Sequence, residues 1–284
     1  MVWIGIRPAS RGPGFVAQLD PRTKRIVKRV GVGAFPDSIA IGMGSIWVGN
    51  DIGGTAREAS GKRNTVSRVS LRDRRVVASI RVPNPVDVDI GGRRVWVASA
   101  TSRRKALVVI DPRTNRVVGR VDLKGATGRP QLAAGANAIW VLAGDERSRS
   151  GGGLLFKVSM RTGRVLWAVA LPGTTAIAYG AGGVWVVVPT ASRRDFAAVL
   201  EIDLRMGRTR RRIPLIRGTS AAFGGGVLWI VGANALSRVD PHTGRASFRT
   251  VPGLGGGYAA AWGLRSLWFT GVGSSTIFRF IPAP

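Results

Sequence analysis

Tryptophan recurs along the chain at nearly constant spacing, and this periodicity restricts the fold to one built from repeated units. Seven tryptophans stand in equivalent aliphatic phrases such as VWIG, IWVG and LWIV. They are Trp3, Trp47, Trp96, Trp140, Trp185, Trp229 and Trp268, at intervals of 44, 49, 44, 45, 44 and 39 residues. Trp167 and Trp262 fall outside the series. Self-similarity at this period is typical of solenoids and propellers, so we expect one supersecondary unit to repeat along the whole length.

Each unit holds four short apolar segments, as residues 35–83 illustrate. The segment 38–41 leads into a glycine turn, and the tryptophan segment follows at 46–48. A variable polar loop then precedes a third segment at 65–69 and a fourth at 76–82. The segments are rich in Val, Ile and Trp and show no helical period, which predicts four β-strands per unit. Four strands in about 44 residues is the pattern of a β-propeller blade.

We therefore predict an all-β fold in which residues 1–284 form a single β-propeller domain. The first unit begins at its tryptophan segment and the last ends after residues 276–280, so both are expected to lack one strand. Five full and two incomplete units favour seven blades, with six as the alternative. The expected blades cover approximately residues 1–34, 35–83, 84–127, 128–173, 174–218, 219–253 and 254–284.

The turn between the third and fourth segments carries its own signature. Asp-Pro-Arg-Thr occurs at 20–23 and 111–114, and Asp-Pro-His-Thr occurs at 240–243. Proline presets the backbone of the second turn position, and the aspartate can accept hydrogen bonds from the backbone beyond it. Together with the phrases IAIGMGSIWVGN and VIDPRTNRVVGRV, these turns make the chain resemble YVTN-type repeat propellers and the virginiamycin B (streptogramin) lyase-like propellers. The resemblance covers essentially the whole chain.

The resemblance to the lyases would imply a histidine general base near the propeller axis, assisted by acidic residues and a magnesium ion. His242, the sole histidine, instead occupies a hairpin turn on the face opposite the usual site. The glutamates Glu58, Glu146 and Glu201 are scattered, and the absence of cysteine excludes thiolate metal sites and cysteine nucleophiles. We expect no catalytic residues, no metal site and no cofactor, which favours a protein without enzymatic activity.

The formal net charge is +28 at pH 7, because 43 basic residues, 37 of them arginine, face only 15 acidic ones. Such a field attracts polyanions over about a Debye length, ~8 Å at physiological salt. Both faces of the predicted propeller are basic, since the hairpins and the opposite loops carry arginine alike. On the face formed by the second-to-third strand loops, here the upper face, the binding candidates are Arg57, Arg63, Arg103, Arg104, Arg147, Arg149, Arg193 and Arg194.

Asp37 and Asp87 are candidates for the central channel. Each follows a blade-to-blade loop, in the phrases FPDSIAIG and NPVDVDIG, near the start of an inner strand. They could bind a cation such as calcium or magnesium, which prefer oxygen ligands, or they could cap the inner strands. Other blades place Gln131, Thr175 or Ser220 in roughly that position, so a complete carboxylate ring is absent, and capping is the favoured interpretation.

Two apolar runs, 174–189 and 219–236, are interrupted by glycines and fit the repeat, so we interpret them as paired strands and predict no transmembrane segment. Closing the ring would require an outer strand for the last blade. We hypothesise that a segment upstream of Met1 supplies it, and that a signal peptide was lost with it. This would favour a location outside the cytoplasm; otherwise the compartment is open.

The sequence thus favours a monomeric, non-enzymatic propeller that presents a basic surface to a protein or an anionic polymer. Sequence-specific recognition of nucleic acid is not expected, because no known reading module is present. The alternative is a lyase-like enzyme of the streptogramin lyase type with a degenerate site. A structural spacer within a longer polypeptide is the third possibility.

Overall fold

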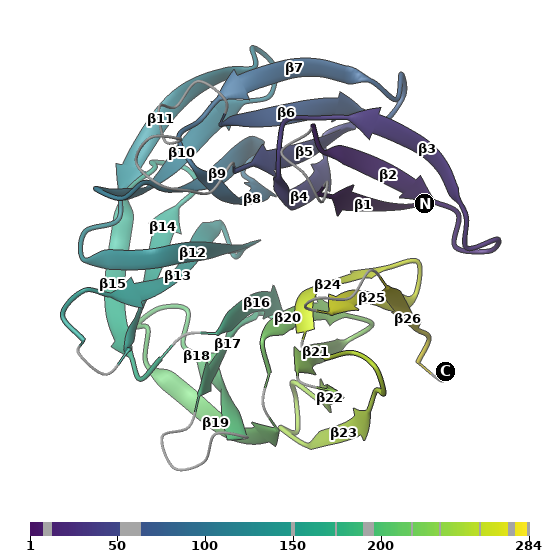
Figure 1. The fold of residues 1–284 in the computed structure, drawn as a ribbon. Coiled ribbons are helices and arrows are strands. Elements are labelled where there is room, and N and C mark those ends of the chain that lie inside the picture. Colours follow the sequence, from purple (N-terminus) through teal and green to yellow (C-terminus); the bar gives the residue numbers. More distant parts are fainter. Residues whose placement is uncertain are drawn as a thin grey trace. The chain divides into compact units, whose positions relative to one another are not determined.

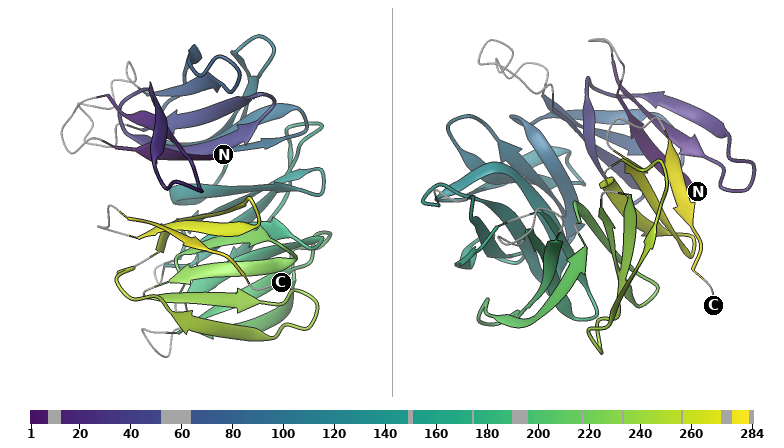
Figure 2. Two further views of the ribbon diagram at one scale, coloured as in Figure 1. Left: turned by 90° about the vertical axis from the view of Figure 1, so that its right-hand side faces the viewer. Right: turned by 60° about the horizontal axis from the view of Figure 1, so that its bottom comes forward.

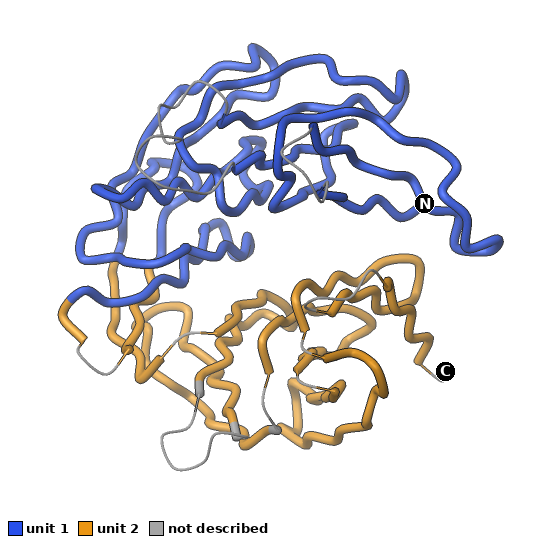
Figure 3. The backbone as a smooth tube through the Cα atoms, viewed as in Figure 1, with its two compact units in different colours: residues 1–146, 157–166 blue, residues 147–156, 167–284 orange. Residues whose placement is uncertain are grey.

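The computed structural model describes residues 1–7, 13–51, 64–148, 151–173, 175–189, 196–216, 218–232, 234–255, 257–271 and 276–282. These residues form strands and turns and include no helix (Figure 1). They belong to two compact units, one comprising 1–146 and 157–166 and the other 147–156 and 167–284 (Figure 3). The strands pair in seven antiparallel sheets, and within each sheet the strand order follows the chain.

The first unit contains three sheets and contributes to a fourth. The first sheet has three strands: β1 (Val2–Ile6), β2 (Phe15–Leu19) and β3 (Ile26–Gly31). The second has four: β4 (Pro36–Gly42), β5 (Ser45–Asn50), β6 (Thr65–Ser70) and β7 (Val76–Arg81). The third comprises β8 (Pro85–Gly91), β9 (Arg94–Ala100), β10 (Lys105–Asp111) and β11 (Arg116–Asp122). The fourth, whose residues are divided between the units, comprises β12 (Ala126–Gly135), β13 (Ala138–Asp145), β14 (Gly153–Ser159) and β15 (Val165–Leu171).

The second unit contains three further sheets. The fifth comprises β16 (Ala176–Gly180), β17 (Gly183–Pro189), β18 (Phe196–Ile202) and β19 (Thr209–Ile216). The sixth comprises β20 (Ser220–Gly224), β21 (Val227–Gly232), β22 (Ala235–Val239) and β23 (Ala246–Thr250). The seventh has three strands: β24 (Gly257–Gly263), β25 (Ser266–Gly271) and β26 (Ile277–Phe280).

This arrangement confirms a β-propeller of seven blades and excludes the six-bladed alternative. Five sheets have four strands, and the first and last have three among the described residues, as the repeat predicts. Within the first unit the inner strands β1, β4, β8 and β12 lie successively side by side, and within the second β16, β20 and β24 do the same (Figure 2). The two apolar runs are paired strands, and the described residues include no helix long and apolar enough to cross a membrane.

The repeated tryptophan forms the same hydrogen bond in five sheets. Its indole Nε1–H donates to the carbonyl of a glycine five residues earlier, at the end of the adjacent inner strand. The pairs are Trp96–Gly91, Trp140–Gly135 and Trp185–Gly180 at 3.0 Å, and Trp229–Gly224 and Trp268–Gly263 at 3.1 Å. A buried indole N–H needs such a partner, which explains why the tryptophan and the glycine turn recur together. The second sheet departs from this pattern, because the buried Nε1 of Trp47 has no partner.

Some of these inner-strand glycines also leave room for a side chain from the next sheet. A Cβ atom on Gly180 would lie 1.9 Å from the ring of Phe223, and one on Gly224 would lie 1.8 Å from the ring of Trp262. Trp262, which is outside the tryptophan series, therefore takes the position that Phe223 occupies one sheet earlier. Its ring stacks on Trp229 with centroids 6.1 Å apart and planes 6° from parallel.

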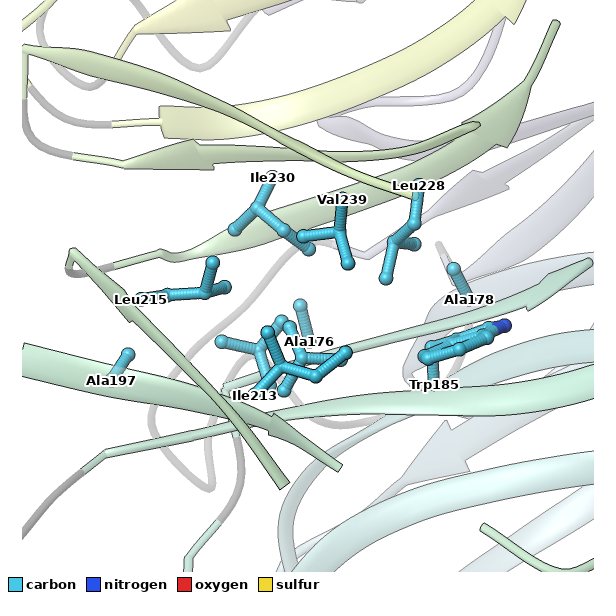
Figure 4. Close-up of a cluster of buried hydrophobic side chains, with 11 residues drawn as sticks. Ala176, Ala178, Trp185, Ala197, Ile213, Leu215, Leu228, Ile230 and Val239 are labelled. Carbon is cyan, nitrogen blue, oxygen red and sulfur yellow. The ribbon is translucent and has the colours of Figure 1, made fainter. Parts of the chain in front are cut away.

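Aliphatic side chains fill the space between neighbouring sheets. Between the fifth and sixth sheets, the buried residues Ile213 and Leu215 of β19 belong to the same cluster as Leu228 and Ile230 of β21 (Figure 4). Trp185 lies at one end of this cluster, beside Ala178. The fifth and sixth sheets thus bury apolar faces against each other, and burial between neighbours of this kind is why a single repeat cannot fold alone.

Arginines on the third or fourth strand connect one sheet to the hairpin of the next. Arg68 stacks over Trp47, with its Cζ 5.0 Å from the ring centroid. Its Nη1 donates to Pro112 O at 2.6 Å and to Asn115 Oδ1 at 2.9 Å, both in the β10–β11 hairpin. In the second unit, Arg211 stacks over Trp185 and donates to the carbonyls of the 240–243 turn. The Asp-Pro turns therefore present carbonyl groups to the preceding sheet.

We predict that Gly224→Ala destabilises the protein by about 2 kcal/mol, because the new Cβ would overlap the Trp262 ring and overpacking of this kind costs about 1–3 kcal/mol. Gly263→Ala is the matched control. It has the same hydrogen bond from its tryptophan, but its Cβ would meet nothing within 4 Å. Urea denaturation should show a lower free energy of unfolding for Gly224→Ala and an unchanged one for Gly263→Ala. Equal losses would contradict the steric explanation.

We further predict that Arg68→Met lowers the free energy of unfolding by about 2 kcal/mol, because it leaves the Pro112 carbonyl and the Asn115 side chain without their cationic donor. Arg72→Met, an exposed position in the β6–β7 turn, is the control and should change stability by less than about 0.5 kcal/mol. Thermal or chemical denaturation of both variants tests this. An unchanged free energy of unfolding in Arg68→Met would show that the bridge between the sheets is dispensable.

Candidate functional site

Three of the eight upper-face arginines lie within the described residues, and all three are exposed. Arg103 and Arg104 occupy the loop between β9 and β10. Thr101 fixes this loop, since its Oγ1 accepts from the Arg104 N–H at 3.1 Å and donates to the Arg104 carbonyl at 2.9 Å. Arg147 follows β13 and belongs to the second unit. The other five lie outside the described residues: Arg57, Arg63, Arg149, Arg193 and Arg194.

Asp37 belongs to a network of charged side chains in the first unit. Its carboxylate forms ion pairs with Arg7, at the end of β1, and with Arg129 of β12. The guanidinium of Arg129 also binds Asp51, with Nη1 2.8 Å from Oδ2. The carboxylate side chains are buried, with 6% of Asp37 and 2% of Asp51 exposed, whereas 56% of the Arg129 side chain is exposed. Two buried acids thus hold one exposed guanidinium.

Backbone irregularities bring these residues together. Pro36 pairs with Asn50 and Ser38 with Gly49, so Asp37 is an extra residue in β4. In β12, Thr127 pairs with Gly144 and Gln131 with Leu142, so residues 128–130 stand opposite a single residue of β13. Gly128 adopts a φ of +67° within this bulge, a conformation that costs glycine little. Bulges re-aim side chains, and here the bulge directs Arg129 toward the second sheet.

Asp87 has a different role from Asp37. Its Oδ1 accepts from the N–H of Val88, and its Oδ2 accepts from the N–H of Leu132 on β12, both at 2.8 Å. Asp89 repeats this arrangement two residues later, with its Oδ2 2.7 Å from the N–H of Ala134. Both carboxylates therefore join β8 to the backbone of the next inner strand. The interpretation of Asp87 as a cap of its own inner strand stays a prediction.

The register explains why the two sequence candidates diverge. Pro36 and Pro85 both open an inner strand, and the terminal glycines are Gly42 and Gly91. Counted back from those glycines, Asp87 corresponds to Ser38, one residue after Asp37. Successive residues of a strand face opposite sides, and Asp37 is in addition bulged, so the two carboxylates take different partners.

Burial raises the pKa of Asp87 from 3.8 to about 7. The backbone N–H donors of Leu132 and Val88 oppose this rise, and the nearby Asp89 carboxylate adds to it. Burial likewise raises the pKa of Asp89, against the N–H donors of Ile90 and Ala134. Two acids enclosed between β8 and β12 thus hold protons more tightly than exposed acids do.

Two further acidic side chains of the described chain, Asp240 and Glu201, accept hydrogen bonds within the fold. His242 lies in the β22–β23 turn, where its backbone N–H donates to Asp240 Oδ1 at 2.8 Å. Two backbone hydrogen bonds lower the pKa of Asp240: the larger effect comes from the N–H of Thr243, and the smaller from the N–H of His242. Glu201 accepts from Arg211 Nε at 2.6 Å. Among the residues the structure describes, no three His, Cys, Asp or Glu side chains converge as metal ligands would.

Sequence reasoning missed Asp51, Asp89 and Arg129. Asp89 could have been found, because it stands two residues after Asp87 and therefore on the same side of the strand. Asp51 directly follows a tryptophan strand, but nothing in the sequence distinguishes it from a loop residue. The flanking Gly128 and Pro130 are the only signal at Arg129, and they indicate an irregular strand without saying where its side chain points.

Comparison with known proteins supports the fold. No family model matches the chain, and no curated protein matches it. Among solved structures, Kuenenia stuttgartiensis hydrazine synthase superposes with a TM-score of 0.76 at 16% identity, over 95% of this chain and 90% of that one. The Myceliophteria thermophila Cps50 (Swd1) β-propeller domain gives 0.66 at 13% identity, over 99% and 100%. The Neurospora crassa Pan2 WD40 domain gives 0.67 at 10% identity, over 94% and 81%. At these identities the likeness shows the fold alone, and it places this chain in the class of β-propeller proteins.

We predict that Asp87 makes a contribution to stability that falls as pH rises between about 4 and 7. Over this range the folded chain retains a proton on Asp87 that the unfolded chain, titrating near 3.8, has lost. The free energy of unfolding therefore falls by up to about 1.4 kcal/mol for each pH unit because of this proton. Urea denaturation from pH 5 to pH 7 should show wild type losing about 2 kcal/mol more than Asp87→Asn, which cannot ionise. Parallel curves for the two proteins would contradict the raised pKa.

Proposed function

We propose that the chain is a non-enzymatic β-propeller that binds an anionic partner through a basic surface. The observation that carries the proposal is the recurrence of exposed arginine around the third-to-fourth strand hairpins of the first four sheets. Each hairpin has one arginine in the turn and one just before or at the start of the outer strand. These are Arg22 and Arg25, Arg72 and Arg75, Arg113 and Arg116, and Arg161 and Arg164.

The use of the carboxylates supports the same conclusion. Asp37 and Asp51 neutralise Arg7 and Arg129 from buried positions. Asp87 accepts backbone hydrogen bonds, and Asp20 does so in its turn, where the N–H of Arg22 lowers the pKa of its carboxyl. Many of the few acids are thus engaged internally while the hairpin arginines are exposed, so the accessible charge is strongly positive. A positive field of this kind favours association with polyanions.

Lyase-like chemistry finds no comparable support. Such an enzyme would need carboxylates converging on a metal and a histidine positioned as a base. Asp37 and Asp51 meet at the guanidinium of Arg129, and the neighbouring Asp87 and Asp89 accept backbone N–H groups of β12. We also propose that the chain is a YVTN-type propeller, on the strength of its repeated IWVG and DPRT phrases.

Binding to duplex DNA and to heparin across a salt titration tests the function. Counterion release should make log affinity fall linearly with log salt, with a slope near −0.9 per phosphate neutralised on duplex DNA. The triple variant Arg72→Gln/Arg113→Gln/Arg161→Gln should flatten that slope by up to about 3, and Arg265→Gln, outside these hairpins, by no more than about 1. Absence of binding to both polymers at physiological salt would overturn the proposal.

A further inference from the structure

Arg129 combines an exposed guanidinium with a fixed position. Arginine side chains at a surface ordinarily sample many rotamers, and ordering them costs free energy on binding. Here the side chain is fixed at two points, by the buried carboxylates of Asp37 and Asp51. The bulge at 128–130 provides the backbone position from which the side chain reaches them. The cost of ordering has therefore been met before any ligand arrives.

The guanidinium retains donors for a ligand. Nη1 donates to Asp51 and Nη2 to Asp37. Among the described residues, Nε and the second hydrogen of each terminal nitrogen have no acceptor. Arg7 lies beside it, since both arginines bind the same carboxylate of Asp37. A ligand oxygen approaching Arg129 would thus meet unused N–H groups of a rigid planar fork, with a second cation close by.

We propose that Arg129 is the centre of a carboxylate-binding site in the first unit of the propeller. The proposal rests on the proposed function and adds one place, outside the third-to-fourth strand hairpins, at which an anionic partner is recognised. The fork geometry suits carboxylate and phosphate alike. Charge decides between them: Arg7, Arg129, Asp37 and Asp51 together carry no net charge, so a phosphate dianion gains no extra attraction over a carboxylate, whereas its desolvation costs more. The ligand is therefore a carboxylate, from an acidic peptide or from a small organic acid.

The competing explanation is that Arg129 only ties the fourth sheet to the second. Arg129→Lys distinguishes the binding role from the structural role, because it keeps the positive charge beside Asp51 and removes the planar fork. Arg129→Ala would be less informative, since it leaves Asp51 buried and unpaired and could unfold the protein. Arg104→Lys is the matched control, because it makes the same change at an exposed arginine elsewhere on the first unit. Neither lysine variant alters the net charge, so generic attraction is constant across the set.

Isothermal titration at constant ionic strength, with hexaglutamate, acetate and inorganic phosphate as probes, tests the proposal. We expect Arg129→Lys to weaken hexaglutamate binding about tenfold and Arg104→Lys to leave it unchanged. The same dependence seen with acetate but not with hexaglutamate would also support the site and would identify the source as a small acid.

Three outcomes would overturn it. Equal hexaglutamate affinity in wild type and Arg129→Lys would leave the proposed function standing and remove this site. Arg129-dependent binding of phosphate in preference to carboxylate would contradict the charge argument. Absence of binding to every probe, together with absence of binding to heparin, would remove both the site and the proposed function. Thermal denaturation of Arg129→Lys checks that any loss of binding occurs in a folded protein.

Discussion

The hydrogen bond from the tryptophan indole to the inner-strand glycine is the interaction on which five of the described sheets are built. It fixes the first two strands of a sheet to each other at the turn that joins them. At Gly180 and Gly224 the same residue also leaves the space into which a ring of the next sheet packs. One residue pair thus sets both the hairpin within a sheet and the space between sheets. Arginine bridges fasten the outer part of two pairs of sheets, through Arg68 to the β10–β11 hairpin and through Arg211 to the 240–243 turn.

Because these interactions repeat, most of the fold could be predicted from the sequence. Trp185 and Gly180 are local in the chain, and their phrase recurs often enough to reveal the unit. The network around Arg129 could not be predicted in the same way. It depends on how many residues a bulge inserts and on which sheet lies opposite, and neither follows from a local pattern. The same limitation made Asp37 and Asp87 look equivalent, although they differ by one residue in register.

The acidic residues are as informative as the basic ones. The chain has only 15 acidic residues against 43 basic ones. Many of the acidic side chains in the described residues accept hydrogen bonds from the backbone or from arginine. Asp20, Asp203 and Asp240 accept turn N–H groups, which lower the pKa of each. Glu201 holds the arginine that reaches the next hairpin. Acids used in this way stabilise the scaffold, and the hairpin arginines of the first four sheets are left exposed.

Strand β12 connects the scaffold with the candidate site. Its regular half is held by Asp87 and Asp89, which accept the N–H groups of Leu132 and Ala134. Its bulged half carries Arg129, which Asp37 and Asp51 hold from the second sheet. The position of the guanidinium therefore depends on four carboxylates, two of them acting through the backbone. Since burial raises the pKa of Asp87 to about 7, the charge at one of these supports changes near neutral pH. The two carboxylates that bind the guanidinium directly are buried, and this burial is what fixes the exposed side chain in one position.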